Sequence, residues 1–346
     1  MRHCIKTVKF SSPSLNLKNA EVQIDIHPRD EQKPPRVTWF AGGKTFYSTD
    51  AYKLYPELKH SVARTTIYEK ETSPTNIFGG AVAGREIAIK FLVLSGSEHL
   101  APVFLMWPTR SFDVRVGANT APAENAAAEV SGSEIAAEVP LLDGSGLPFL
   151  CGLRREAGVP EELSFYEAPV TAAWDLVPTD PKTGAAIPGG KPYGYIKMSP
   201  AETFEVEYTV TRPSGWNSSA MVSIYSAEDL YSIFSARTFI FESEYKAACE
   251  AGMLQGVDAD CGLLLPDADA ASAAAANALK DADKTAVAPY RVLEEPARHK
   301  ILDLLGDLSF VVPALPKIRL EILNGGHISH RQILEKLLPY VSLGNS

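Results

Sequence analysis

Alternating apolar and polar residues predict several β-strands in the first third of the chain. Residues 22–26 alternate as a half-buried strand does, residues 37–40 follow a Pro-Pro break, and residues 112–116 alternate again. Residues 5–10 also alternate, as a first strand would, and the competing interpretation of this basic N-terminus is a weak transit peptide. A further apolar strand at residues 87–94 leads to Glu98 and His99. The first third is therefore expected to be rich in β-structure.

The second half of the chain mixes strand-like and helix-like segments. Strands are expected at residues 170–176, 204–210, 239–241 and 261–265, and helices at residues 227–234, 244–252 and 298–307. Residues 121–137, rich in Ala, Glu and Ser, predict a surface excursion. The Ala- and Asp-rich stretch 267–288 predicts a surface loop, because it has too few large apolar side chains to fold on its own. This mixture predicts an α+β protein.

Composition narrows the class of protein. The 346 residues are enough for two domains with separate cores. The net charge of −9, without a basic run, argues against a nucleic-acid partner. The four cysteines form no C-x-x-C pair, which favours free thiols in a reducing compartment. No apolar run approaches the ~20 residues that span a bilayer.

The helix expected at residues 298–307 carries candidate metal ligands. His299 and Asp303 lie four residues apart, so their side chains project from one face and suit a single tetrahedral ion. Asp307 lies one turn further, where a carboxylate orients a neighbouring imidazole. The alternative is a solvated helix whose charges fall in line, which is the commoner meaning of an isolated H-x-x-x-D. The metal hypothesis gains support from two other segments, Ser97-Glu98-His99-Leu100 and Asn324-Gly325-Gly326-His327.

Five segments, in order, resemble the UDP-3-O-acyl-N-acetylglucosamine deacetylases (the LpxC family). The family motif E-H-L matches residues 98–100, I-P-[IL]-x-D-G-S-x-x-P-F matches 139–149, A-R-T-F-x-F matches 236–241, R-H-K-x-x-D-x-x-G-D matches 298–307, and G-H-A-L-N-N matches 326–331, where the chain diverges after the histidine. The likeness covers most of the chain from about residue 87. The family's glycine-rich G-L-H-[ST]-G turn is replaced by residues 14–19, with Asn16 at the histidine position. Because Asn tolerates left-handed backbone, the turn itself is expected to survive.

The resemblance implies a fold as well as an activity. It implies two similar α+β domains, residues 1–150 and 151–346, in a two-layer sandwich with the active site at their interface. A small β-α-β insert at residues 239–265 would form an apolar passage for an acyl chain. The alternative is that the apolar residues of this insert are simply core.

The resemblance also assigns roles to the candidate residues. It implies a Zn²⁺ ion held by His99, His299 and Asp303, with a fourth position open for water. Glu98 would be the general base, and His327, oriented by Asp307, the general acid. Lys300, Thr238 and Phe239 would contact the substrate. The remaining histidines, His3, His27, His60 and His330, are predicted to be surface residues.

The function implied is a zinc amidohydrolase that deacetylates an acylated UDP-N-acetylglucosamine on the route to lipid A. Two alternatives stay open: a deacetylase of another acylated amino sugar, and a non-catalytic zinc-containing protein that binds sugar nucleotides. We expect a cytoplasmic monomer, with organellar targeting and transient contact with a membrane surface left open.

Overall fold

The computed structural model of the chain describes residues 6–14, 21–29, 35–41, 44–48, 59–61, 64–70, 89–117, 134–179, 186–252, 254, 260–267, 290–309 and 314–341. Within these ranges helices and strands are mixed, which confirms the expected α+β class. Three expectations fall wholly or mostly outside the described residues: the turn at Asn16, residues 121–133 of the surface excursion, and residues 268–288 of the Ala- and Asp-rich stretch.

The first sheet has five strands in the order β1-β2-β8-β3-β4. They are β1 (Val8–Pro13), β2 (Glu21–Arg29), β3 (Val37–Ala41), β4 (Lys44–Ser48) and β8 (Ser111–Val116). Val22, Ile24 and Ile26 of β2 are all buried, as their alternation predicts. The strands expected around residues 22–26, 37–40 and 112–116 are therefore confirmed.

A four-stranded sheet, in the order β5-β6-β7-β9, leads to the first candidate ligands. It contains β5 (Lys59–Ser61), β6 (Arg64–Lys70), β7 (Ile89–Ser95) and β9 (Glu134–Glu138). The chain passes from β7 directly into two 3₁₀ helices, η2 (Ser97–His99) and η3 (Ala101–Met106). Residues 134–137 were wrongly expected in a surface excursion, since they belong to β9. Ala- and Glu-rich segments have weak strand propensity, and parallel pairing with β7 decides their structure.

The second large sheet repeats the topology of the first. Its main path is β11-β12-β17-β13-β14, and β10 pairs with β17 in parallel. The strands are β10 (Phe165–Glu167), β11 (Ala172–Leu176), β12 (Gly194–Pro200), β13 (Phe204–Thr211), β14 (Asn217–Ile224) and β17 (Leu315–Leu323). In both five-strand paths the successive pairings are antiparallel, antiparallel, parallel and antiparallel. The sequence gives no hint of this repeat.

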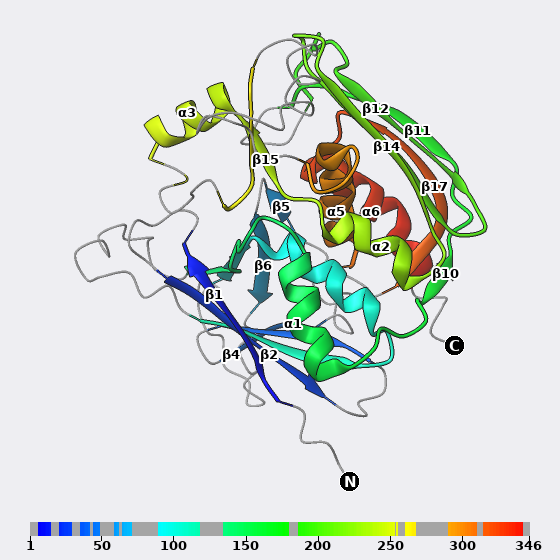
Figure 1. Cartoon of the computed structure of the whole chain (residues 1–346). Helices are drawn as coiled ribbons and strands as arrows, with labels where there is room; N and C mark the ends of the chain where they lie inside the picture. Colours follow the sequence, from blue (N-terminus) through cyan, green and yellow to red (C-terminus); the bar gives the residue numbers. More distant parts are fainter. Residues whose placement is uncertain are drawn as a thin grey trace, which may run out of the picture.

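Helices fill the space between the two large sheets (Figure 1). They are α1 (Leu147–Ala157), α2 (Ala227–Phe234), α5 (Glu295–Ser309) and α6 (His327–Val341). Helix α5 contacts β13 and β14 on one side and η2 and η3 on the other. Every residue of α5 except Arg298 and Lys300 is buried. A helix buried on nearly all sides normally carries only apolar residues, so its buried His and Asp side chains require another explanation.

A small unit attached to the second sheet has the expected strand–helix–strand order. It consists of β15 (Phe239–Phe241), α3 (Glu242–Glu250) and β16 (Leu263–Leu265), and the two strands are parallel. Its apolar side chains form a separate cluster with Trp216 from the turn between β13 and β14. Arg212 at the end of β13 anchors the unit, since its guanidinium lies 3.9 Å above the Phe241 ring and 2.5 Å from Glu244.

Candidate active site

Helix α5 and the segment after β7 meet at Gly306. A Cβ atom at this position would lie only 2.1 Å from the backbone oxygen of Glu98. No side chain fits there, so the glycine allows the helix to touch the backbone that carries Glu98 and His99. This contact brings two segments from opposite halves of the chain into one site.

Two imidazoles and one carboxylate converge beside this contact. The Nε2 atoms of His99 and His299 lie 3.6 Å and 3.2 Å from the same Oδ1 of Asp303, and the two rings are 4.9 Å apart. All three side chains are buried. Donor atoms about 2.1 Å from a tetrahedral zinc ion are separated by about 3.4 Å, so the spacing suits one ion. The three ligand atoms form a candidate metal group.

The hydrogen bonds around this trio favour metal binding. His299 Nδ1 donates to the carbonyl oxygen of Ala236 at 3.1 Å, which leaves Nε2 as the lone-pair nitrogen that faces Asp303. Burial lowers the pKa of His299 despite the nearby Asp303, so the ring is neutral, as a ligand must be.

Lys300 forms an ion pair with Asp303 that keeps its carboxylate ionised. Its Nζ donates to Asp303 Oδ2 at 3.0 Å. Burial opposes ionisation of both groups, but their mutual attraction wins: the pKa of Lys300 is raised and that of Asp303 lies well below its usual range. Lys300 also lies 5.4 Å above the ring of Phe239, which in turn stands edge-on to His299. The structure therefore brings Lys300 and Phe239 to the trio.

A second cluster is centred on Asp307. Its Oδ2 accepts hydrogen bonds from Nδ1 of His327 and Nδ1 of His330, each at 2.8 Å. Burial alone would lower the pKa of His327, but the Asp307 carboxylate outweighs it and raises that pKa to about 10. His327 is therefore a charged imidazolium at neutral pH. The expected pairing of Asp307 with His327 is found in the structure.

His330 contradicts its prediction as a surface residue. It is fully buried, and its Nε2 lies 2.9 Å from the hydroxyl of Tyr208. The prediction was wrong because residues 327–341 were not identified as a helix. On α6 a spacing of three residues places His327 and His330 on one face, which is the signal that would have found it.

Glu98 and Thr238 occupy different positions relative to the trio. Glu98 is half-buried, and its negative charge helps to raise the pKa of both Lys300 and His327, so its carboxylate lies near both. Thr238 donates its backbone N–H to Gly144 at 2.6 Å, and a Cβ on Gly144 would lie 2.7 Å from its methyl group. Thr238 thus joins the β15 unit to the Asp143-Gly144-Ser145 turn.

A buried ion pair fixes the start of α5. The guanidinium of Arg237 binds both carboxylate oxygens of Glu295, at 2.8 Å and 3.1 Å, and Glu295 is completely buried. Ala236, which receives the His299 hydrogen bond, directly precedes Arg237. The pair therefore ties the carbonyl that orients His299 to the helix that carries His299.

The site thus combines a candidate metal group of three ligands with two further groups, the Glu98 carboxylate and the His327 imidazolium. This combination is typical of metal-dependent hydrolases. Comparison with known proteins agrees with this class. The family model of UDP-3-O-acyl N-acetylglycosamine deacetylase matches residues 120–339, and the chain belongs to that family, LpxC.

Curated relatives are similar over about half to two-thirds of this chain. A UDP-3-O-acyl-N-acetylglucosamine deacetylase of Synechocystis sp. is 27% identical over 202 residues, 58% of this chain and 63% of the relative. The enzyme of the same name from Anaeromyxobacter sp. is 27% identical, covering 62% and 61%. A bifunctional LpxC/FabZ enzyme of Porphyromonas gingivalis is 28% identical, covering 51% and 38%. The chain thus spans less than two-thirds of the length of these relatives.

Four expectations concern the whole protein. Among the helices that the structure describes, none is long and apolar enough to cross a bilayer. The expected monomeric state and cytoplasmic location stay predictions, as does the domain boundary at residue 150.

Proposed function

We propose that this protein is a zinc-dependent deacetylase that hydrolyses the acetamide of a UDP-3-O-acyl-N-acetylglucosamine. The observation that carries this proposal is the convergence of His99, His299 and Asp303 with a carboxylate, Glu98, and an imidazolium, His327, nearby. Family membership supports the choice of an acylated sugar nucleotide as the substrate.

His99, His299 and Asp303 would hold the metal. When bound, zinc polarises the amide carbonyl and lowers the pKa of water to about 7. The donor set fits zinc because neutral imidazole and carboxylate are both ordinary zinc ligands, and three protein ligands are the usual number at a catalytic site. Lys300 keeps Asp303 ionised without being a ligand itself.

Glu98 and His327 would move the two protons that amide hydrolysis requires. Glu98 takes a proton from the attacking water, and His327 delivers one to the leaving nitrogen. An acid must carry its proton when the bond breaks, and the pKa of His327, about 10, ensures that it does at neutral pH. Asp307 holds His327 through Nδ1, which leaves Nε2–H as the proton to be delivered.

The β15 unit would supply affinity for the acyl chain. Its apolar cluster of Trp216, Phe241, Leu263 and Leu265 adjoins Phe239, which reaches His299. If an acyl chain followed Phe239 towards this cluster, burial of each methylene would contribute about 0.8 kcal/mol of binding free energy. Thr238 and Lys300 would contact the polar part of the substrate at the mouth of this route.

The first experiment combines elemental analysis with a deacetylation assay on purified protein. We expect one zinc per chain, and His299→Ala should lose most of it, whereas His27→Ala, a histidine of β2 outside the site, should keep it. Glu98→Ala and His327→Ala should each reduce kcat by about 10²-fold or more with zinc retained. Stoichiometric zinc in His299→Ala, or parent turnover in Glu98→Ala, would overturn the assignment.

A second experiment tests the substrate. Rates are measured on UDP-N-acetylglucosamine with acyl chains of increasing length and with none. We expect kcat/KM to rise with chain length, because each buried methylene adds binding energy that the transition state also uses. A flat series would exclude the acyl route and favour a different amino-sugar substrate.

A further inference from the structure

Asp307 serves two imidazoles through one oxygen atom. We propose that His330, acting with Tyr208, is a positioning residue that fixes Asp307 so that His327 presents its outer proton to the leaving group. The inference rests on the proposed function, because it assigns His330 a part in the same reaction. Position 330 is Asn in the motif G-H-A-L-N-N given above and His in this chain.

Tyr208, His330, Asp307 and His327 are linked by three hydrogen bonds, and the donor of each bond can be assigned. Both imidazoles meet the Asp307 carboxylate through Nδ1, so both Nδ1 atoms carry a proton. A neutral His330 then has a lone pair on Nε2, which accepts the Tyr208 hydroxyl at 2.9 Å. Burial keeps Tyr208 a phenol, since it raises the pKa well above 10, and burial lowers the pKa of His330. The order is therefore Tyr208 to His330 to Asp307, with His327 on the other side.

Burial separates the roles of the two imidazoles. The side chain of His327 is 15% exposed, whereas that of His330 is 0% exposed. Only His327 is open to a substrate, so His330 acts through Asp307. Each hydrogen bond to a carboxylate limits rotation about its terminal torsion, which is otherwise broad. A second donor on the same oxygen restricts that rotation and thereby the orientation of His327.

The backbone around Tyr208 is shaped for this contact. A Cβ atom on Gly325 would lie 2.6 Å from both the Tyr208 hydroxyl and Ile322 Cγ2, so a larger residue here would displace the Tyr208 hydroxyl or its neighbour. At the start of α6 the N–H of Gly326 donates to Ser329 Oγ, and the N–H of His330 donates to the carbonyl of Gly326. The first turn of the helix is thus fixed next to β13, and both imidazoles are held at Asp307.

The same three groups, Asp307, His327 and His330, also form a candidate metal group. Two features favour the hydrogen-bonded arrangement. Both nitrogen–oxygen distances, 2.8 Å, are hydrogen-bond lengths, and the other nitrogen of His330 is already occupied by Tyr208. A second metal in this cluster would contradict the proposal, and the experiment below detects it.

Two substitutions of His330 separate its hydrogen bond from its bulk. In His330→Asn the amide nitrogen stands at the same number of bonds from Cα as Nδ1, so it still donates to Asp307. In His330→Leu that donor is lost. Both variants leave the Tyr208 hydroxyl without its imidazole, so they share that cost in stability. Tyr208→Phe/His330→Leu removes the hydroxyl as well and serves where His330→Leu alone folds poorly.

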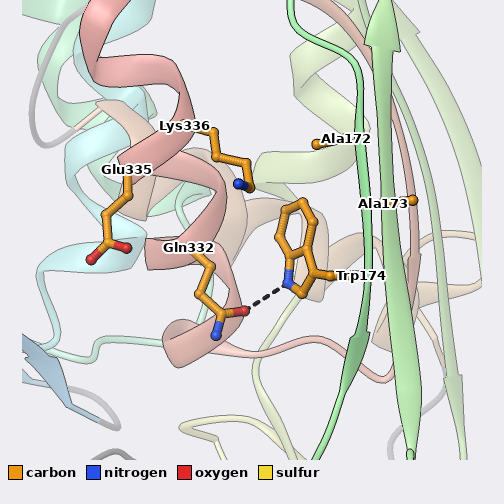
Figure 2. Close-up of a pocket in the computed structure, with 6 residues that line it drawn as sticks. All are labelled: Ala172, Ala173, Trp174, Gln332, Glu335 and Lys336. Carbon is orange, nitrogen blue, oxygen red and sulfur yellow. Dashed lines mark hydrogen bonds between the residues drawn. The ribbon is translucent and has the colours of Figure 1, made fainter.

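Gln332 provides a matched control on the same helix. Figure 2 shows its side chain directed at the Trp174 indole, whose N–H donates to Gln332 Oε1 at 2.8 Å, on the side of α6 that faces β11. Gln332→Leu therefore removes a hydrogen bond between α6 and the sheet without touching Asp307. We expect it to change Tm and to leave kcat unchanged.

The measurements are kcat, KM, zinc content, Tm and the ¹⁵N–¹H signals of labelled histidine. In His330→Leu, kcat should fall about 10-fold or more, as is usual for loss of such supporting hydrogen bonds, while KM and zinc stay constant. His330→Asn should recover most of kcat and keep the Nδ1–H signal of His327, which should broaden in His330→Leu.

Several outcomes would overturn the proposal. These are parent kcat in His330→Leu or in the double variant, equal kcat in the Asn and Leu variants, and a second zinc that is lost on substitution of His330. If the parent itself lacks deacetylase activity, the proposed function fails, and the His327 signal still decides whether His330 orients that ring.

Discussion

Replacing Gly306 with alanine should damage the site far more than the stability of the fold. The new Cβ would lie 2.1 Å from the oxygen of Glu98, 2.6 Å from its Cα and 2.7 Å from its carbonyl carbon. Carbon atoms pack best about 3.5–4.0 Å apart, so α5 and the Glu98 backbone must separate by about 1 Å. Alanine gains about 1 kcal/mol of helix propensity, whereas overpacking costs about 1–3 kcal/mol. The net loss in unfolding free energy is then at most about 2 kcal/mol.

The same 1 Å displacement acts directly on the proposed metal group and on Glu98, the proposed base. It moves His99 Nε2 away from Asp303 Oδ1, which now lie 3.6 Å apart, and it moves Glu98 as well. A misplacement of that size costs about 10²-fold in rate, and we expect weaker zinc binding as well. The assay is kcat and zinc content in parallel with urea denaturation.

Gly152→Ala is the control for this substitution. It also lies within a helix, α1, but the atoms nearest to its Cβ would belong to side chains and not to backbone: the end of the Phe10 ring at 2.5 Å and Val8 Cγ1 at 3.3 Å. It should keep both zinc and turnover. Gly306→Ala with parent turnover and full zinc would show that the contact with Glu98 does not set the geometry of the site.

Three further predictions follow from the electrostatics. Arg237→Met should lower the unfolding free energy by about 3–5 kcal/mol, because Glu295 stays buried without its countercharge. Arg237→Met/Glu295→Leu should recover only part of this loss, since the backbone N–H groups of residues 237 and 291 then lose their acceptor. Equal Tm values for the parent and Arg237→Met would contradict the prediction. The His327–Asp307 pair should stabilise the fold fully between about pH 4, where the Asp307 carboxyl is ionised even in the unfolded chain, and pH 6.5, and lose its effect as pH rises towards about 10, since the folded pKa of His327 is raised. A difference in unfolding free energy between parent and His327→Gln that stays constant from pH 6.5 to 10 would refute it. Chelation of the metal should lower Tm in the parent but not in His299→Ala, and an equal shift in both would place the ion elsewhere.

The sequence was sufficient for the parts of the site that depend on local spacing. The i, i+4 relation of His299 and Asp303 and the strand before Glu98 were both predictable, because they need only helical or extended backbone. The role of Gly306 was not, since nothing local reveals that another segment touches it. Contacts of that kind become visible only when both halves are placed.

The second helix of the site was harder to predict. Helix α6 contains Pro339 near its end and begins after Asn324, which has a positive φ of 54°, so neither end follows a simple pattern. Without that helix His330 looked like an isolated polar residue. Strand β14 was also missed, because its buried positions include Ser218 and Ala220, which are small and give little hydrophobic signal.

The meeting of η2 with α5 has a consequence for how the protein folds. His99 and His299 are 200 positions apart in the chain, so the donor group closes a very long loop. Contacts of such high sequence separation form late and slowly, after local helices and hairpins. We therefore expect the proposed metal group to assemble in the last stage of folding, when its two segments meet. Zinc uptake during refolding should follow the recovery of helical circular dichroism with a separate, slower phase, and a partly folded chain would bind the ion with only one of its histidines.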